Sequence, residues 1–150
     1  MINIKKNNIF FYILIFFFFF NIKAISKENF FKEAKNKYDE KKMDDSKFLF
    51  QRNIVFNPKD ANSYLYLAKI YNYEKNEKEE LKNLKTTLLL QPNNEEAMFM
   101  LINIELEKSN FSEVRDLTSK FQVICLNLCN ETEEINQRLK DIEAKSFDSK

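Results

Sequence analysis

The chain has 150 residues, of which 44% are hydrophobic and 31% charged, the balance of a folded protein with at most one domain. It contains no glycine and only two prolines, which argues against hairpin-rich β architectures, because their turns rely on glycine with positive φ. Residues 27–150 carry 21 basic side chains (24 less the three before residue 27) and 23 acidic ones, so they offer no basic surface for nucleic acid. We therefore expect an all-α protein without a nucleic-acid partner.

Residues 1–26 have the features of an export signal. Lys5 and Lys6 form a short basic region, and Ile9–Phe20 is an uninterrupted run of twelve apolar residues. As a helix of about 1.5 Å per residue this run would span about 18 Å, less than the ~30 Å hydrocarbon layer of a membrane. The length therefore favours a cleaved signal peptide over a spanning helix.

Two cleavage positions fit the sequence that follows the apolar run. One lies after Ser26, with Ala24 at position −3, and the other after Ala24, with Ile22 at position −3. The alternative is an uncleaved anchor that holds the chain at the outer face of a membrane. In both cases we expect the folded part outside the cytoplasm, in the periplasm or another extracytoplasmic space.

From residue 27 the sequence divides into three rows with a period of 34 residues: 27–60, 61–94 and 95–130, the last slightly overlong. The only prolines, Pro58 and Pro92, are 34 residues apart, and each ends an apolar-periodic segment. Each row contains two apolar stripes at helical spacing around a short polar turn. Residues in equivalent positions agree, as in the columns Phe30, Tyr64, Met98 and Phe56, Leu90, Ile124. Each row is therefore predicted to be a helical hairpin.

The rows resemble tetratricopeptide repeats, whose first helix carries large apolar, small and aromatic residues and whose second helix ends at a proline. The second row matches best, with Tyr64, Leu67, Ala68, Tyr71, Leu81, Leu84, Leu88, Leu90 and Pro92. The resemblance implies a right-handed α-solenoid of three hairpins. Three residues depart from the family pattern at positions where packing is close, and they lead us to expect looser helix packing: Glu80, Ile102 and Glu105.

The third row lacks the proline that ends the other two, since Leu126 stands in its place. We therefore expect its second helix to continue to about Cys129 and to carry Cys125 as well. We expect both cysteines to be small buried apolar residues, because a regular helix places an i, i+4 pair poorly for bridging. A disulfide in a distorted last turn and a redox or metal-binding role are the alternatives.

A last helix is predicted over 131–145, with Asn130 as its N-cap and one apolar edge formed by Ile135, Leu139 and Ile142. Its other face is charged, as in the polar capping helix that a solenoid needs at its end. We expect residues 146–150 to be frayed.

Catalytic chemistry is hard to build from this composition. Histidine, the commonest general base and metal ligand, is absent, and without glycine there is no P-loop and no dinucleotide fingerprint. The carboxylates fall at spacings typical of solvated helix faces. We therefore expect neither an enzyme nor a cofactor or metal site.

The family resemblance also implies a binding surface, because particular first-helix positions line the concave face of such solenoids. These columns hold Phe31, Leu65 and Phe99, then Lys35, Lys69 and Asn103, and then Tyr38, Asn72 and Leu106. An apolar strip beside a polar strip suits an extended peptide or an amphipathic helix. The alternative is that the apolar column packs against adjacent helices.

Together these features predict an exported, non-enzymatic interaction module or adaptor that binds a protein or peptide on its concave face. Membrane contact is expected only through residues 9–20, if they are retained. The alternative is an accessory subunit anchored at a membrane and packed into a larger cell-envelope complex.

Overall fold

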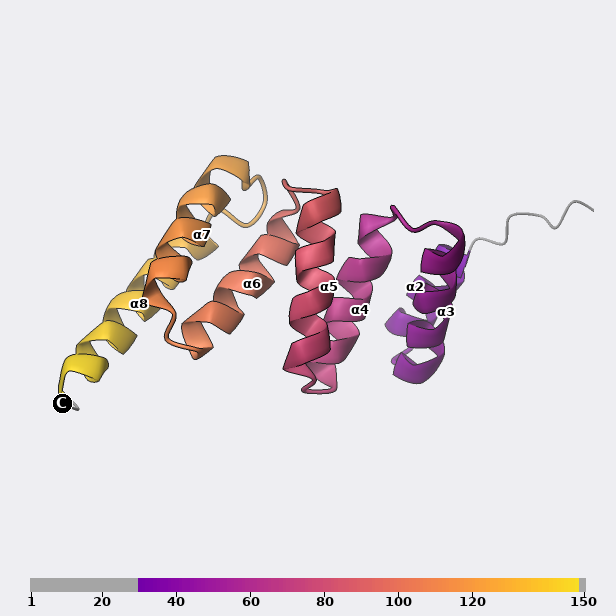
Figure 1. Cartoon of the computed structure of the whole chain (residues 1–150), viewed down its shortest axis with the longest axis horizontal. Helices are drawn as coiled ribbons and strands as arrows, with labels where there is room; N and C mark the ends of the chain where they lie inside the picture. Colours follow the sequence, from indigo (N-terminus) through magenta and orange to yellow (C-terminus); the bar gives the residue numbers. More distant parts are fainter. Residues whose placement is uncertain (1–29, 149–150) are drawn as a thin grey trace, which may run out of the picture.

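The computed structural model describes residues 30–148, which form seven α-helices and no strand, arranged in an elongated row (Figure 1). The helices pair as hairpins, followed by one further helix: α2 (Phe30–Asp39) with α3 (Met43–Phe56), α4 (Ala61–Tyr73) with α5 (Glu77–Leu90), α6 (Glu95–Glu107) with α7 (Phe111–Ile124), and then α8 (Glu131–Asp148). This confirms the all-α class and the three hairpins. The expected export signal, residues 1–26, lies outside the described residues.

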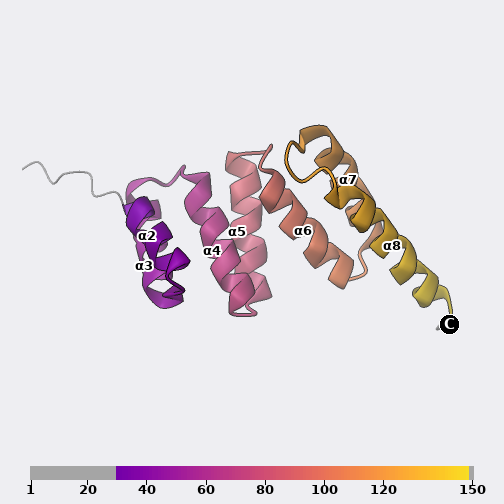
Figure 2. The same cartoon turned by 180° about the vertical axis from the view of Figure 1, so that it is seen from behind.

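The helices form two layers along the row. In Figure 1 α3, α5 and α7 lie toward the viewer, and in the reverse view of Figure 2 α2, α4 and α8 do. The turns within hairpins lie along one edge of the row, and the connections between hairpins lie along the other (Figure 1). We call these the hairpin-turn edge and the connection edge.

The turns within the hairpins repeat one backbone geometry with the 34-residue period. Lys41, Lys75 and Ser109 have φ of 62°, 59° and 58°, in the left-handed region. In each turn this residue's N–H donates to the carbonyl three residues earlier, and the next N–H donates to the carbonyl five residues earlier, at 2.9–3.0 Å. This is the Schellman ending of a helix, which usually employs glycine. Because the chain has no glycine, lysine and serine occupy these positions.

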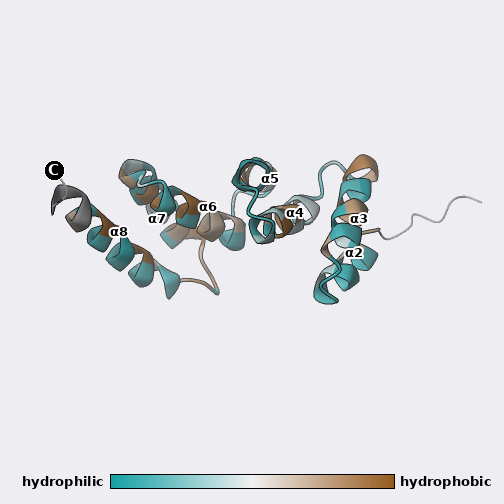
Figure 3. Ribbon diagram, turned by 90° about the horizontal axis from the view of Figure 1, so that it is seen from below, coloured by the Kyte–Doolittle hydropathy of each residue, from teal (hydrophilic) through white to brown (hydrophobic). Residues whose placement is uncertain are grey.

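The core is divided between neighbouring hairpins, and α4 contributes to both parts. Leu67 and Ile70 pack with buried residues of α2 and α3, whereas Leu65 and Ala68 pack with residues of α5, α6 and α7. The buried residues of one hairpin therefore continue into the next, as expected for a solenoid. In Figure 3 hydrophobic residues are visible on α3, α4, α6 and α7, and the end of α5 that faces the viewer is hydrophilic.

The helices of the third hairpin pack least closely, whereas looser packing than in a consensus array stays a prediction. The α6–α7 contact is the least extensive of the three hairpin contacts, whereas the α4–α5 contact, which contains Glu80, is the most extensive. Glu80 is 4% exposed and its Oε1 accepts a hydrogen bond from Asn72 Nδ2 at 3.0 Å. The Glu105 carboxylate accepts from Asn110 Nδ2, and Ile102 is fully buried. A hydrogen bond satisfies the Glu80 carboxylate inside the hairpin, so this residue does not hold α4 and α5 apart.

The second helix of the third hairpin is not overlong, contrary to the sequence-based expectation. α7 ends at Ile124, and Cys125, with ψ of 140°, has left the helical conformation. Its N–H donates to the Phe121 carbonyl at 2.8 Å, just as Asn57 and Gln91 donate four residues back at the ends of α3 and α5. All three second helices therefore stop in the same column, with or without a proline after it.

The connection after α7 is held by a disulfide and by one carboxylate. Cys125 and Cys129 are bonded, with their Cα atoms 5.2 Å apart. The favoured prediction of buried free thiols was therefore wrong. Because the helix ends before Cys125, the pair lies on irregular backbone that permits a bridging distance. The Glu95 carboxylate accepts from the backbone N–H groups of Leu126 and Asn127 at 2.7 and 3.0 Å, and from Asn127 Nδ2 at 2.7 Å.

α8 closes the end of the row. Ile135 and Leu139 are buried in the core of the third hairpin, and the partly buried Ile142 packs against it, as the predicted apolar edge requires. The helix continues to Asp148, three residues beyond its predicted end at Lys145. None of the helices in residues 30–148 is long and apolar enough to cross a membrane.

Candidate functional site

Packing buries part of the predicted apolar column, which consists of Phe31, Leu65 and Phe99. Leu65 is 5% exposed and belongs to the core, so its predicted place on a binding surface was wrong. Phe31 is half-buried, with its ring centroid 5.6 Å from that of Phe50 and 5.8 Å from that of Tyr66. Phe99 is also half-buried and lies 6.2 Å from Phe121. The column therefore forms no continuous exposed strip.

The two predicted lysines are paired with carboxylates. Lys35 Nζ lies 3.0 Å from Asp39, and Lys69 Nζ lies 2.6 Å from Glu96 and 4.7 Å from the centre of the Tyr66 ring. The hydrogen bond to Asp39 raises the pKa of Lys35. Because each lysine has an anionic neighbour, this column gives no net positive surface for an acidic ligand.

The remaining predicted residues lie in three different settings. The Tyr38 ring packs edge-on against Tyr66 at 5.1 Å. Asn72 donates to Glu80, as described above. The Asn103 side chain donates to the Phe99 carbonyl at 3.1 Å and accepts from Arg138 Nη1 at 2.6 Å, so α8 holds it in place.

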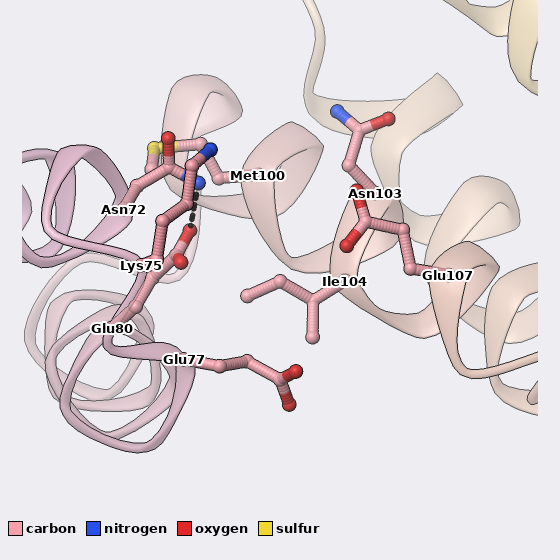
Figure 4. A pocket seen from close by; sticks show the side chains of 8 residues that line it. All are labelled: Asn72, Lys75, Glu77, Glu80, Met100, Asn103, Ile104 and Glu107. Atoms are coloured by element: carbon pink, nitrogen blue, oxygen red, sulfur yellow. Dashed lines mark hydrogen bonds between the residues drawn. The ribbon is translucent and has the colours of Figure 1, made fainter.

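A cavity of about 360 Å³ brings two of these residues together, between the α4–α5 turn and α6 (Figure 4). Asn72 lies on one wall and Asn103 on the other. The lining also contains apolar side chains from α6 and charged side chains from both walls: Met100, Ile104, Lys75, Glu77, Glu80 and Glu107. In the view of Figure 4 the Ile104 side chain lies between the carboxylates of Glu77 and Glu107. A second, wider hollow of about 590 Å³ contains none of the predicted residues.

The electrostatics of the cavity are acidic. Its lining holds three glutamates and one lysine. Burial raises the pKa of Glu80, the Asn72 hydrogen bond opposes that rise, and the nearby charges of Glu107 and Glu77 add to it. Glu77 is also paired with Lys108 at 2.5 Å, and that hydrogen bond raises the pKa of Lys108. A site of this kind favours a cationic group over an anionic one.

Sequence reasoning missed the acidic character of the site. The missed residues are Met100, Ile104, Glu77, Glu80 and Glu107. One signal was present, since Glu80 occupies a column that is usually a small residue. A carboxylate in place of a small side chain puts charge next to the cavity.

No protein-family model and no curated protein matches the sequence. Solved structures do match it in fold. SycD of Yersinia enterocolitica, in complex with a peptide of the translocator YopD, has a TM-score of 0.68 at 17% identity, covering 84% of this chain and 98% of that one. PcrH, in complex with the chaperone-binding region of PopD, has a TM-score of 0.66 at 15% identity, covering 83% and 98%.

The TPR2B domain of yeast Sti1, in a complex with pHsp70, has a TM-score of 0.65 at 14% identity, covering 79% of this chain and 96% of that domain. At these identities the likeness shows the fold alone. The 34-residue period, the three repeated hairpins and these structural neighbours agree, and the chain is built of tetratricopeptide-like helical repeats.

Proposed function

We propose that this protein is a non-enzymatic binding module that holds a protein or peptide segment in the cavity between its second and third hairpins. The observation that carries the proposal is the cavity itself. It joins the Asn72 and Asn103 positions of the predicted concave columns and combines apolar side chains with carboxylates. A mixture of apolar surface and a few convergent polar groups is typical of sites that bind ligands.

The structural neighbours support peptide binding. SycD and PcrH are each solved with a segment of a translocator protein, and the Sti1 domain is solved in a complex with pHsp70. The same fold therefore serves peptide recognition in other proteins. All three are binding modules, which also supports a non-enzymatic role here.

The lining defines the chemistry of the segment that fits. Met100 and Ile104 offer an apolar contact, and Glu107 stands beside it together with Glu77, whose carboxylate is paired with Lys108. A lysine or arginine next to an aliphatic residue satisfies both requirements, because its apolar stem packs while its charged end meets the carboxylates. An acidic segment would meet repulsion from the same glutamates.

We further propose that the protein is exported, so that binding takes place outside the cytoplasm. Residues 1–26 have the composition of an export signal, as described above. The Cys125–Cys129 disulfide supports the proposal independently, because disulfides persist in oxidising compartments and are rare in the cytosol. N-terminal sequencing of the native protein distinguishes a cleaved signal, which starts at Ile25 or Lys27, from a retained anchor, which starts at Met1.

A displayed library of random peptides tests the binding proposal. Panning on the purified domain should enrich peptides with a lysine or arginine beside an aliphatic residue. Glu107→Lys should remove that enrichment, because it reverses a charge in the lining, whereas Asp141→Lys on the exposed face of α8 should leave it unchanged. Enrichment of acidic peptides, or equal enrichment by both variants, would show that the cavity is not the site.

A further inference from the structure

Three exposed apolar residues repeat with the 34-residue period outside the proposed binding site. Val55, Leu89 and Val123 are 76%, 81% and 84% exposed, and each lies in the last two residues of its helix, α3, α5 or α7. Phe56, 61% exposed, and Leu126, 87% exposed, lie near them in sequence. Single exposed apolar residues are ordinary, but here the same position is apolar and exposed in all three hairpins, which forms a periodic row.

The row lies along the connection edge, where α3, α5 and α7 end (Figure 1). The connections on this edge carry few charges, whereas the first turns of α6 and α8, which begin at the same edge, hold Glu95, Glu96, Glu131, Glu133 and Glu134. The connections 57–60, 91–94 and 125–130 comprise 14 residues, of which two are charged, Lys59 and Asp60. The turns on the opposite edge, 40–42, 74–76 and 108–110, comprise nine residues, of which six are charged. The connections are therefore less charged than the turns on the opposite edge.

The chain enters the domain at the same edge. α2 begins at Phe30, whose ring stacks on that of Phe56 at 5.5 Å, next to the first residue of the exposed row. The apolar run Ile9–Phe20 is separated from Phe30 by nine residues, 21–29. Nine residues span at most about 30 Å when fully extended. A membrane that holds the run therefore lies within reach of the connection edge.

We propose that a lipid bilayer covers the connection edge, and that the domain stands on the membrane with Val55, Leu89, Val123 and Leu126 at its surface. A lipid surface fits better than a protein groove, because the exposed residues form a row along one edge, and Phe30, from which the sequence leads back to the apolar run, stacks on Phe56 at this edge. In this orientation the cavity and the hairpin-turn edge do not point into the lipid. The proposal rests on the alternative in which Ile9–Phe20 is an uncleaved anchor, and it does not depend on what the cavity binds.

The absence of tryptophan allows a direct test, since one introduced tryptophan is the only indole in the chain. Leu89→Trp and Val123→Trp place it on the connection edge. Asp44→Trp, at a position whose side chain is 97% exposed beside the hairpin-turn edge, is the matched control. Each full-length variant is reconstituted into phosphatidylcholine vesicles with and without brominated acyl chains, and circular dichroism confirms that its helix content matches that of the parent.

We expect the tryptophan emission of both connection-edge variants to shift to the blue and to lose intensity with brominated lipid. The Asp44→Trp emission should stay at its aqueous wavelength and unquenched. Equal quenching of all three variants would overturn the proposal, because the domain would have no fixed edge on the membrane. Unquenched emission from both edge variants in chains that float with the vesicles would overturn it as well, and so would failure of the chain to float.

Discussion

Glu95 ties the end of the third hairpin to its beginning through hydrogen bonds. It is the first residue of α6, yet its carboxylate accepts the N–H groups of the connection that follows α7. These hydrogen bonds, first the one from the Leu126 backbone, lower the pKa of Glu95 to about 2. The connection thereby gains from a carboxylate the fixed geometry that Pro58 and Pro92 give to the other two.

The first prediction concerns the pH dependence of that contact. A carboxyl whose pKa is lowered in the folded state stabilises the protein above its ordinary pKa of about 4.5, and this contribution is lost as the pH falls toward 2. Glu95→Gln should therefore lower the thermal midpoint at pH 7, and the difference from the parent should shrink progressively between pH 5 and pH 2. Thermal unfolding followed by circular dichroism measures both.

Glu96→Gln provides the matched control, because the neighbouring carboxylate contacts Lys69 and has no part in the α7–α8 connection. It should lower the midpoint at pH 7 by less than Glu95→Gln does. If the thermal midpoint of Glu95→Gln stayed below that of the parent by the same amount at all pH values, the ionised carboxylate of Glu95 would not be the source of the stabilisation.

The second prediction concerns Glu80, whose ionised form is expected to destabilise the folded protein, whereas the ionised form of Glu95 stabilises it. Burial raises the pKa of this carboxyl, so its ionised form opposes folding at pH values above the raised pKa. Glu80→Gln keeps an oxygen that accepts from Asn72 and removes the charge. The variant should have a higher thermal midpoint than the parent at pH 7, and the two should converge below pH 4, where both side chains are neutral. A lower midpoint for the variant at pH 7 would show that the charge stabilises the hairpin.

At the scale of the elements, the hairpin turns are the most regular feature and also a source of strain. Each Schellman turn places a residue with a Cβ in the left-handed region, which costs about 1 kcal/mol relative to glycine. The period of the turns could be predicted from the polar gaps between apolar stripes. Their positive φ could not, because without glycine nothing in the sequence marks the position.

Ser109→Gly tests this strain. It should raise the free energy of unfolding by about 0.5–1 kcal/mol, since relief of the left-handed serine exceeds the added freedom of the unfolded chain. Ser112→Gly, in the first turn of α7, is the control and should lower the free energy by a similar amount, because glycine is disfavoured within a helix. Chemical denaturation of both variants gives the comparison. If Ser109→Gly lowered the free energy of unfolding, the claim that Ser109 is strained in the left-handed conformation would be wrong.

The sequence predicts the ends of the second helices in the first two hairpins, but not the end of the second helix in the third hairpin. Pro58 and Pro92 set the register, and the helix ends followed from it. At Leu126 the same reasoning failed, because the stop signal there comes from the distant Glu95 and from a disulfide, neither of which local propensity reports. Tertiary contacts of this kind override local signals.

At the scale of the whole molecule, the repeat predicted which residues share a face, but it did not predict whether those residues are buried or paired with opposite charges. The concave columns were placed by register, yet Leu65 is core and the lysines are neutralised by Asp39 and Glu96. The charge of the cavity arises where the start of one hairpin's second helix faces the next hairpin, a juxtaposition that one column of sequence does not show. The connection edge likewise appears only when exposure is compared across all three hairpins.

The central claim is that partners bind at the cavity between the second and third hairpins, and site-specific photo-cross-linking in the native cell tests it most directly. A photoreactive amino acid replaces Glu107 in the cavity lining or Lys82, which is 71% exposed on α5 and outside the lining. We predict that irradiation yields a discrete protein adduct at position 107 and none at 82, and that the cross-linked segment contains a lysine or arginine beside an aliphatic residue. Adducts at 82 but not at 107, or none at either position, would contradict the account.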